Sequence, residues 1–199
     1  VRNAGFRAHA LGEAPEIARR EHGPHGVFLG YDFHLGRAGP QLIEINTNAG
    51  GALLNAALAG AQQACCVEVS AVLGGSVDPT RLREELVEMF HNEWRLQRGE
   101  RPLRTVAIVD EAPESQFLYP EFLLFRELFR AAGLEAEIVD VNDLRFADGH
   151  LRAGETAIDL VYNRHTDFYL GSTATTALRA AYEAGATVVT PHPRAYALY

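Results

Sequence analysis

The sequence contains no lysine, because all 18 of its Lys and Arg residues are arginine. A phosphate-binding loop of the G-x-x-x-x-G-K-[ST] type is therefore excluded, since its lysine has to reach the phosphates of the nucleotide. Cysteine is also scarce: the 199 residues include two, the neighbours Cys65 and Cys66. Adjacent residues point away from each other on a helix, so we expect buried thiols here rather than a disulfide or a metal site.

Long apolar runs and an excess of basic residues are missing as well. The sequence has no apolar stretch long enough to span a membrane and no signal peptide. Its formal net charge of -8 disfavours binding to nucleic acid or to an anionic membrane. The G-x-G-x-x-G loop of dinucleotide-binding folds and the G-x-S-x-G turn of hydrolases are absent too. We therefore expect a cytoplasmic protein without nucleic-acid or membrane partners, and the sequence does not indicate its oligomeric state.

The overall composition is that of an ordinary globular protein with a full core, with 47% hydrophobic and 22% charged residues. A length of 199 residues suggests about one domain, with room for a small appendage. The chain begins at Val1 rather than at a methionine, and it stops at Tyr199 where the pattern of a new helix has just begun. We therefore expect it to be a piece of a longer polypeptide.

A β-hairpin is predicted where two alternating runs, residues 27–34 and 41–46, flank the turn-rich residues 36–40. With the turn centred on Ala38, Asp32 lies opposite Glu44 and Gly30 lies opposite Asn46. Since successive side chains alternate between the faces of a strand, one face of the hairpin is polar and the other apolar. We expect the apolar face to pack on a core; it would carry Val27, Leu29, Tyr31, Phe33, Ile43 and Ile45.

The polar face of this hairpin brings together Asp32, Glu44 and Asn46. Two carboxylates that face each other across a pair of strands are destabilising unless another group offsets their repulsion. A hard cation is the simplest such group, and Mg²⁺ is commonly held by one or two carboxylates together with substrate phosphates and water. The alternative is a solvated polar face on which the two acids point apart.

The remaining pattern predicts helices in the first half of the chain and an α/β alternation in the second half. The expected helices are residues 10–22, 52–73, 79–97, 119–132 and 172–184; the expected strands are residues 105–109, 135–139, 157–162 and 187–190, with a small hairpin at 144–152. The fold class is therefore α/β, with N-terminal helices and a β-hairpin joined to a doubly wound, mostly parallel sheet. We expect residues 1–103 to hold the hairpin and residues 104–199 to form a Rossmann-like region, together one compact unit.

In a doubly wound sheet the ligand crevice lies outside the carboxyl ends of the strands. Residues 114–116 and 163–167 follow two of the predicted strands and should lie there. Arg164 suits the bidentate capture of a carboxylate or phosphate, while the alternative is a structural ion pair with Asp159 or Asp167. Residues 47–51 form a glycine-containing loop before a helix, whose free backbone N–H groups could bind an anion.

Three of these segments resemble a family of ATP-dependent ligases. The segment LIEINTNAGG resembles the I-E-I-N-T segment of eukaryotic-type glutathione synthetase, and the spacing of Asp32, Glu44 and Asn46 resembles the metal-binding set of glutathionylspermidine synthetase. Both are ATP-grasp carboxylate–amine ligases. The segment DLVYNRHTDFYL is similar to the V-Y-F-R-D-G-Y strand and loop of glutathione synthetase, which contacts the peptide substrate. Residues 114–116 resemble the E-R-N substrate loop of the same enzyme more weakly. The chain departs from these relatives at Gly30, where they have an arginine.

The resemblance implies a pre-ATP-grasp fold and a function. The chain would be the substrate- and Mg²⁺-binding half of a ligase that joins a small-molecule carboxylate to an amine through an acyl phosphate, with ATP held mainly by a missing C-terminal domain. The alternative is a non-catalytic α/β domain that binds a small molecule or a partner. Asp32, Glu44 and Asn46 would bind Mg²⁺, and the substrate-binding residues would be Thr47, Asn48, Gly50, Gly51, Glu114, Gln116, Asn163, Arg164 and Asp167.

Overall fold

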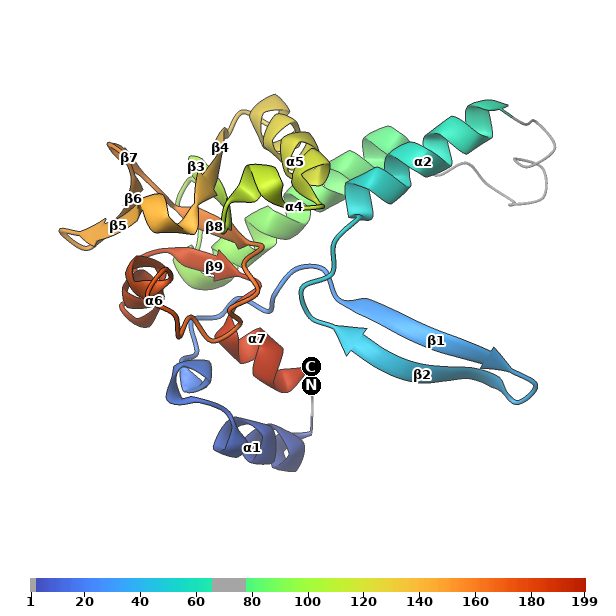
Figure 1. Cartoon of the computed structure of the whole chain (residues 1–199), viewed down its shortest axis with the longest axis horizontal. Coiled ribbons are helices and arrows are strands. Elements are labelled where there is room, and N and C mark those ends of the chain that lie inside the picture. Colours follow the sequence, from blue (N-terminus) through green and yellow to red (C-terminus); the bar gives the residue numbers. More distant parts are fainter. Residues whose placement is uncertain (1–2, 66–77) are drawn as a thin grey trace.

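The computed structural model describes residues 3–65 and 78–199 (Figure 1). Its α-helices are α1 (Ala4–Glu13), α2 (Ala52–Cys65), α4 (Pro79–Arg98), α5 (Tyr119–Ala131), α6 (Thr176–Glu183) and α7 (Pro193–Leu198), with 3₁₀ helices η1 (Glu16–Arg19), η2 (Pro113–Ser115) and η3 (Val141–Asp143). The strands are β1 (Gly30–Gly36), β2 (Gly39–Asn46), β3 (Thr105–Asp110), β4 (Glu135–Asp140), β5 (Leu144–Ala147), β6 (His150–Ala153), β7 (Thr156–Ala157), β8 (Leu160–Asn163) and β9 (Val188–Thr190). None of the helices in these two ranges combines the length and the apolar character needed to cross a membrane.

A parallel four-stranded sheet forms the centre of the molecule, in the order β4-β3-β8-β9. After β3 the chain adds β4 on one side and then returns to add β8 on the other side of β3. The direction of the winding therefore reverses between β3 and β8, which is the place where doubly wound sheets bind ligands. The predicted α/β fold class with a mostly parallel sheet is confirmed.

Both faces of this sheet are buried, which explains the continuous apolar runs of its strands. Val106 and Ile108 of β3 face one core together with apolar side chains of α4 and α5. Ala107 and Val109 face a second core together with α6, β5 and β6. Helices thus cover both faces, as Figure 1 shows for α4 and α5 against α6.

Two predicted helices are shorter in the structure. The helix expected over residues 10–22 ends at Glu13, and a separate 3₁₀ helix follows at Glu16–Arg19. Pro15 causes this break, because proline has no N–H and disfavours helical backbone in the preceding residue. The helix expected over residues 172–184 begins at Thr176, because the backbone N–H of Ser172 donates to Asp167 Oδ2 at 2.7 Å and holds residues 172–175 in a loop.

The other predicted helices and strands agree with the structure to within a few residues. The predicted strand 157–162 is divided between β7 and β8, and β7 pairs with β6 to extend the small hairpin into a three-stranded sheet. The part of the predicted helix 52–73 beyond Cys65, together with the predicted burial of the two thiols, lies outside the described residues.

The hairpin of β1 and β2 extends away from the body of the molecule (Figure 1). The prediction that the apolar face of the hairpin packs on the core is therefore wrong. Tyr31 and Phe33 are 50% and 51% exposed, and Ile43 is 66% exposed. Val27 does reach the core, at 1% exposure. The positive φ of 56° at Phe28 separates Val27 from the strand, so β1 starts beyond the core, at Gly30.

Candidate functional site

The two acids of the hairpin face each other across its strands. β1 and β2 are antiparallel, with Asp32 opposite Glu44 and Gly30 opposite Asn46. The predicted turn centre at Ala38 is nevertheless wrong, because Gly36 pairs with Gly39. A register shift between Asp32 and Phe33 absorbs the difference, so a β-bulge restores the predicted pairing at the base of the hairpin.

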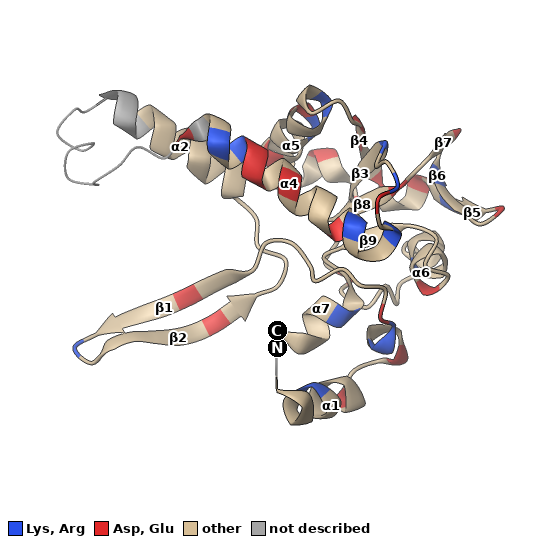
Figure 2. Ribbon diagram, turned by 180° about the vertical axis from the view of Figure 1, so that it is seen from behind, with Lys and Arg blue, Asp and Glu red and all other residues tan. Residues whose placement is uncertain are grey.

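Asn46 connects these two acids. Its Nδ2 donates to Asp32 Oδ2 at 3.4 Å and to Glu44 Oε1 at 3.2 Å. All three side chains are exposed, and the two acids are the red bands on β1 and β2 in Figure 2. The N–H groups of the Asn46 amide thus offset the repulsion between the carboxylates of Asp32 and Glu44.

The same three side chains fit a magnesium ion by their chemistry. Two carboxylates and an amide oxygen are oxygen donors of the kind that Mg²⁺ takes, with water and phosphate oxygens completing its shell. The Asn46 amide would have to turn over so that its oxygen faces the acids. Within residues 3–65 and 78–199 no group of three or more His, Cys, Asp or Glu is placed to hold a metal, so a cation on the hairpin would depend on Asn46.

A cavity of about 450 Å³ lies beside the base of the hairpin, at the carboxyl ends of β3 and β8. One part of its lining is polar and comes from Asn46, Thr47, Asn48, Asp110, Gln116, Arg164 and Thr166. The other part is apolar and comes from Ile45, Phe117, Leu118, Phe122 and Phe168. Five of the predicted site residues therefore meet here, at the point where the winding of the sheet reverses.

Arg164 is buried in the wall of this cavity and holds the loop after the hairpin. Its Nη1 donates to Asn48 Oδ1 at 2.6 Å and to Ala49 O at 3.1 Å, and its Nη2 donates to Asn48 O at 3.3 Å. Asn48 returns a bond from Nδ2 to Arg164 O at 3.3 Å. The structural partner of Arg164 is thus the loop of Asn48, and neither Asp159 nor Asp167 is among its hydrogen-bond acceptors.

The anion site predicted at the start of α2 is occupied by a side chain of the protein itself. The buried carboxylate of Glu121 accepts the Gly51 N–H at 2.6 Å and the Leu53 N–H at 3.0 Å. A carboxylate at a helix N-terminus satisfies free donors and interacts well with the helix dipole. The expectation that these N–H groups are free is therefore wrong, and neither Gly50 nor Gly51 lines the cavity.

Asp110 is a further residue of the cavity, and no sequence motif indicated it. It is the last residue of β3, is 8% exposed and lines the cavity. Its Oδ1 accepts the Glu111 N–H at 2.8 Å. Burial raises the pKa of the Asp110 carboxyl, against the opposing effects of that hydrogen bond and of the nearby His165. A single acid at the carboxyl end of an apolar strand, as in TVAIVD, is the sequence signal that could have identified it.

Three further predicted substrate residues do not line the cavity. Glu114 is exposed on η2, and Asn163 is fully buried with Nδ2 at 3.5 Å from Pro191 O and from Tyr196 Oη. Asp167 accepts bonds from Ser172 N and from Thr175 Oγ1. Partial burial acts to raise the pKa of Asp167, but hydrogen bonds from its own loop outweigh it and lower this pKa to about 2. Asp167 therefore organises that loop.

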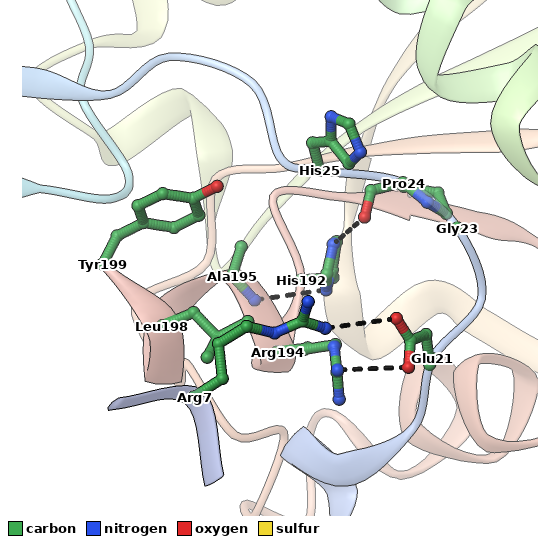
Figure 3. Close-up of a pocket in the computed structure, with 10 residues that line it drawn as sticks. All are labelled: Arg7, Glu21, Gly23, Pro24, His25, His192, Arg194, Ala195, Leu198 and Tyr199. Carbon is green, nitrogen blue, oxygen red and sulfur yellow. Dashed lines mark hydrogen bonds and ion pairs between the residues drawn. The ribbon is translucent and has the colours of Figure 1, made fainter. Parts of the chain in front are cut away.

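A second cavity, of about 240 Å³, lies between α1 and α7 (Figure 3). Arg7 and Arg194 both point at Glu21 there, at 3.5 and 3.2 Å. His192 is buried beside them, with Nε2 at 2.9 Å from Pro24 O. The charged groups of this cavity pair with one another, so we assign it a structural role.

No protein-family model matches the chain, and comparison with curated proteins finds no relative.

Proposed function

We propose that this chain supplies the Mg²⁺- and substrate-binding part of an ATP-dependent carboxylate–amine ligase that acts through an acyl phosphate. The observation that carries the proposal is the position of Asn46. Its side chain contacts both hairpin acids and also lines the cavity at the switch point of the sheet. A cation site and a small-molecule site therefore adjoin, as the transfer of a phosphoryl group to a bound carboxylate requires.

Each part of the site would have its own role. Asp32, Glu44 and Asn46 would hold the cation, which when bound neutralises phosphate charge. Arg164 positions residues 48 and 49 through three hydrogen bonds, and these bonds go to neutral oxygens. Its positive charge therefore remains at the cavity wall, where it favours an anionic substrate. Phe122 and Leu118 exclude water from the other side of the cavity.

A non-catalytic binding domain is the second candidate, and one observation favours it. The Asn46 amide already offsets the repulsion between Asp32 and Glu44, so the hairpin does not need a cation to be stable. In that case the cavity would bind its small molecule without any chemistry on the hairpin.

Paramagnetic NMR tests the metal site directly. Mn²⁺ takes the same oxygen ligands as Mg²⁺, and it broadens the resonances of nearby nuclei. We expect low concentrations of Mn²⁺ to broaden the Asn46 side-chain amide signals of the ¹⁵N-labelled chain, and excess Mg²⁺ to reverse this. Glu44→Gln should remove the effect, whereas Glu135→Gln, which changes an exposed strand glutamate at a distance, should leave it. Equal broadening in the two variants would exclude the hairpin as a metal site.

ADP release tests the reaction. The intact polypeptide that contains this chain should release ADP from ATP only when Mg²⁺, an acid and an amine are all present. The isolated chain should bind ATP poorly, because it has no lysine and no phosphate-binding loop. Mg²⁺-dependent binding of ATP by the isolated chain, seen in calorimetry, would contradict this division of labour. Small-molecule binding without ADP release under any condition would favour the non-catalytic domain.

A further inference from the structure

The cavity beside the hairpin has an unusual aromatic rim. Phe117 is 95% exposed and Phe168 is 40% exposed, and both line the cavity. Phe168 packs against Tyr196 with the two rings tilted, and the ring centroids are 4.6 Å apart. Removing apolar surface from water is stabilising, so two phenyl rings left in water at a cavity mouth favour a ligand that covers them.

The same cavity contains one acidic group that a ligand can pair with. Asp110 is more than nine-tenths buried, and one of its carboxylate oxygens accepts the Glu111 N–H. Burial disfavours the charged form of this carboxyl, whereas the nearby His165 and Arg164 favour it. A cationic group of a ligand would restore the solvation that the carboxylate loses, so the cavity wall favours an ammonium at this point.

A separate part of the cavity wall, at Arg164, suits an anionic group of the ligand. The Arg164 guanidinium lines the cavity, its Nη atoms bond to neutral oxygens, and its Nε is buried without a hydrogen-bond partner among the described residues. Asn46 and Thr47 lie on the same wall, next to the hairpin acids. A carboxylate would be attracted to this wall, and there it would face the proposed cation site.

We propose that the cavity binds a zwitterionic amino acid with an aromatic or large apolar side chain. Its ammonium group would pair with Asp110, its carboxylate would lie on the wall of Arg164 and Asn46, and its side chain would cover Phe117 and Phe168. A volume of about 450 Å³ suits a molecule of this size. This inference rests on the proposed function, since it names the acid substrate of the same site.

Four matched ligands test the three contacts separately. L-Phenylalanine has all three groups, 3-phenylpropionate lacks the ammonium, 2-phenylethylamine lacks the carboxylate, and L-alanine lacks the ring. We expect L-phenylalanine to bind the chain in calorimetry and to shift the amide signals of Asp110, Phe117 and Phe168. Each of the other three should bind at least about tenfold more weakly, since each omits one paired or buried group.

Variants of the chain then assign each preference to a residue. Phe117→Ala should reduce the preference for L-phenylalanine over L-alanine, and Asp110→Asn should reduce the preference for L-phenylalanine over 3-phenylpropionate. Phe6→Ala removes a phenylalanine that is 51% exposed on α1, far along the chain, and should change neither preference. The amide spectrum of each variant shows whether it is folded.

The results separate this inference from the proposed function. Equal binding of L-phenylalanine and L-alanine, equal binding of L-phenylalanine and 3-phenylpropionate, or no binding of L-phenylalanine would each overturn it. The Mn²⁺ experiment at Asn46 needs no amino acid. Broadening there with no binding of L-phenylalanine would leave the metal site in place and reject the substrate class alone.

Discussion

The carboxylate of Glu121, on α5, accepts the backbone N–H of Gly51 at 2.6 Å and so closes the N-terminus of α2. Its other oxygen accepts the Leu53 N–H at 3.0 Å. Glu121 is 1% exposed, so one buried acid ties the loop after the hairpin to the helix that borders the cavity. Gly50 lies between this acid and Arg164.

Glu121→Gln should destabilise the protein. Glutamine keeps one acceptor oxygen but places an NH₂ group against a second N–H donor, so we expect a loss of about 1–3 kcal/mol in the free energy of unfolding. Urea unfolding measures this loss. Glu127→Gln on the same helix is the control: its side chain is 59% exposed and pairs with Arg126 and Arg130, so it should cost under about 1 kcal/mol. Similar losses in the two variants would show that Glu121 is not a cap of α2.

Gly50→Ala should disturb the cavity wall. A Cβ at this position would lie 2.4 Å from Leu118 Cδ1 and 2.9 Å from Arg164 Nη2, so these two side chains or the loop must shift. We expect a destabilisation of about 1–3 kcal/mol, as for other overpacked sites, and changed amide signals at Asn48 and Arg164.

The matched control is Gly60→Ala, within α2. A Cβ there meets nothing within 4 Å, and alanine is the better helix former, so this variant should gain about 0.5–1 kcal/mol. Thermal unfolding of the two variants therefore should shift in opposite directions. Shifts of the same sign and size would contradict the close packing at Gly50.

Glu44→Gln should separate the proposed catalytic role of the hairpin acids from any role in folding. The substitution removes one of two facing carboxylates, so the stability of the chain should be unchanged or higher by about 0.2–1 kcal/mol. In the proposed ligase it should abolish ADP release, because the cation would lose a ligand. A variant that unfolds, while its remaining folded fraction keeps normal turnover, would show that Glu44 supports the hairpin and binds no catalytic metal.

The stability of the protein should fall at mildly acidic pH because of His192. Burial lowers the pKa of His192 from 6.5 to about 4, against the weaker opposing effects of Pro24 O and Glu93. The folded state therefore binds this proton less readily than the unfolded state. The stability that the neutral His192 contributes is complete above pH 6.5. As the pH falls from 6.5 towards 4, the free energy of unfolding should decrease by about 3 kcal/mol.

His192→Asn checks this assignment. Asparagine can still accept the Ala195 N–H at the start of α7, but it does not titrate. The variant should lose a constant amount of stability above pH 6.5 and should approach the wild type between pH 6.5 and 4. Unfolding curves at a series of pH values measure the difference. A difference that does not change with pH would assign the acid sensitivity to other groups.

The sequence alone determines the local elements and the parallel sheet. The apolar runs of β3 and β8 can be stable only when both faces are covered, so the α/β class follows from them. Glu44 and Asn46 share a face because side chains alternate along a strand. Their meeting with Asp32 was predicted from a turn centred on Ala38, which is wrong, and the predicted pairing holds because a bulge beyond Asp32 shifts the register back.

Only the tertiary structure decides which groups remain free to bind. The sequence of the loop before α2 predicts an anion site. In the structure the carboxylate of Glu121, 70 residues away, accepts the Gly51 N–H of this loop. The sequence predicts that the Arg164 guanidinium is available to a ligand. In the structure it donates hydrogen bonds to Asn48, 116 residues earlier. The apolar face of the hairpin reads as core, yet Tyr31 remains half exposed because the hairpin extends past the body of the molecule. Local patterns determine periodicity and side-chain chemistry, whereas the partner of a buried charge depends on contacts between distant segments, which no local pattern encodes.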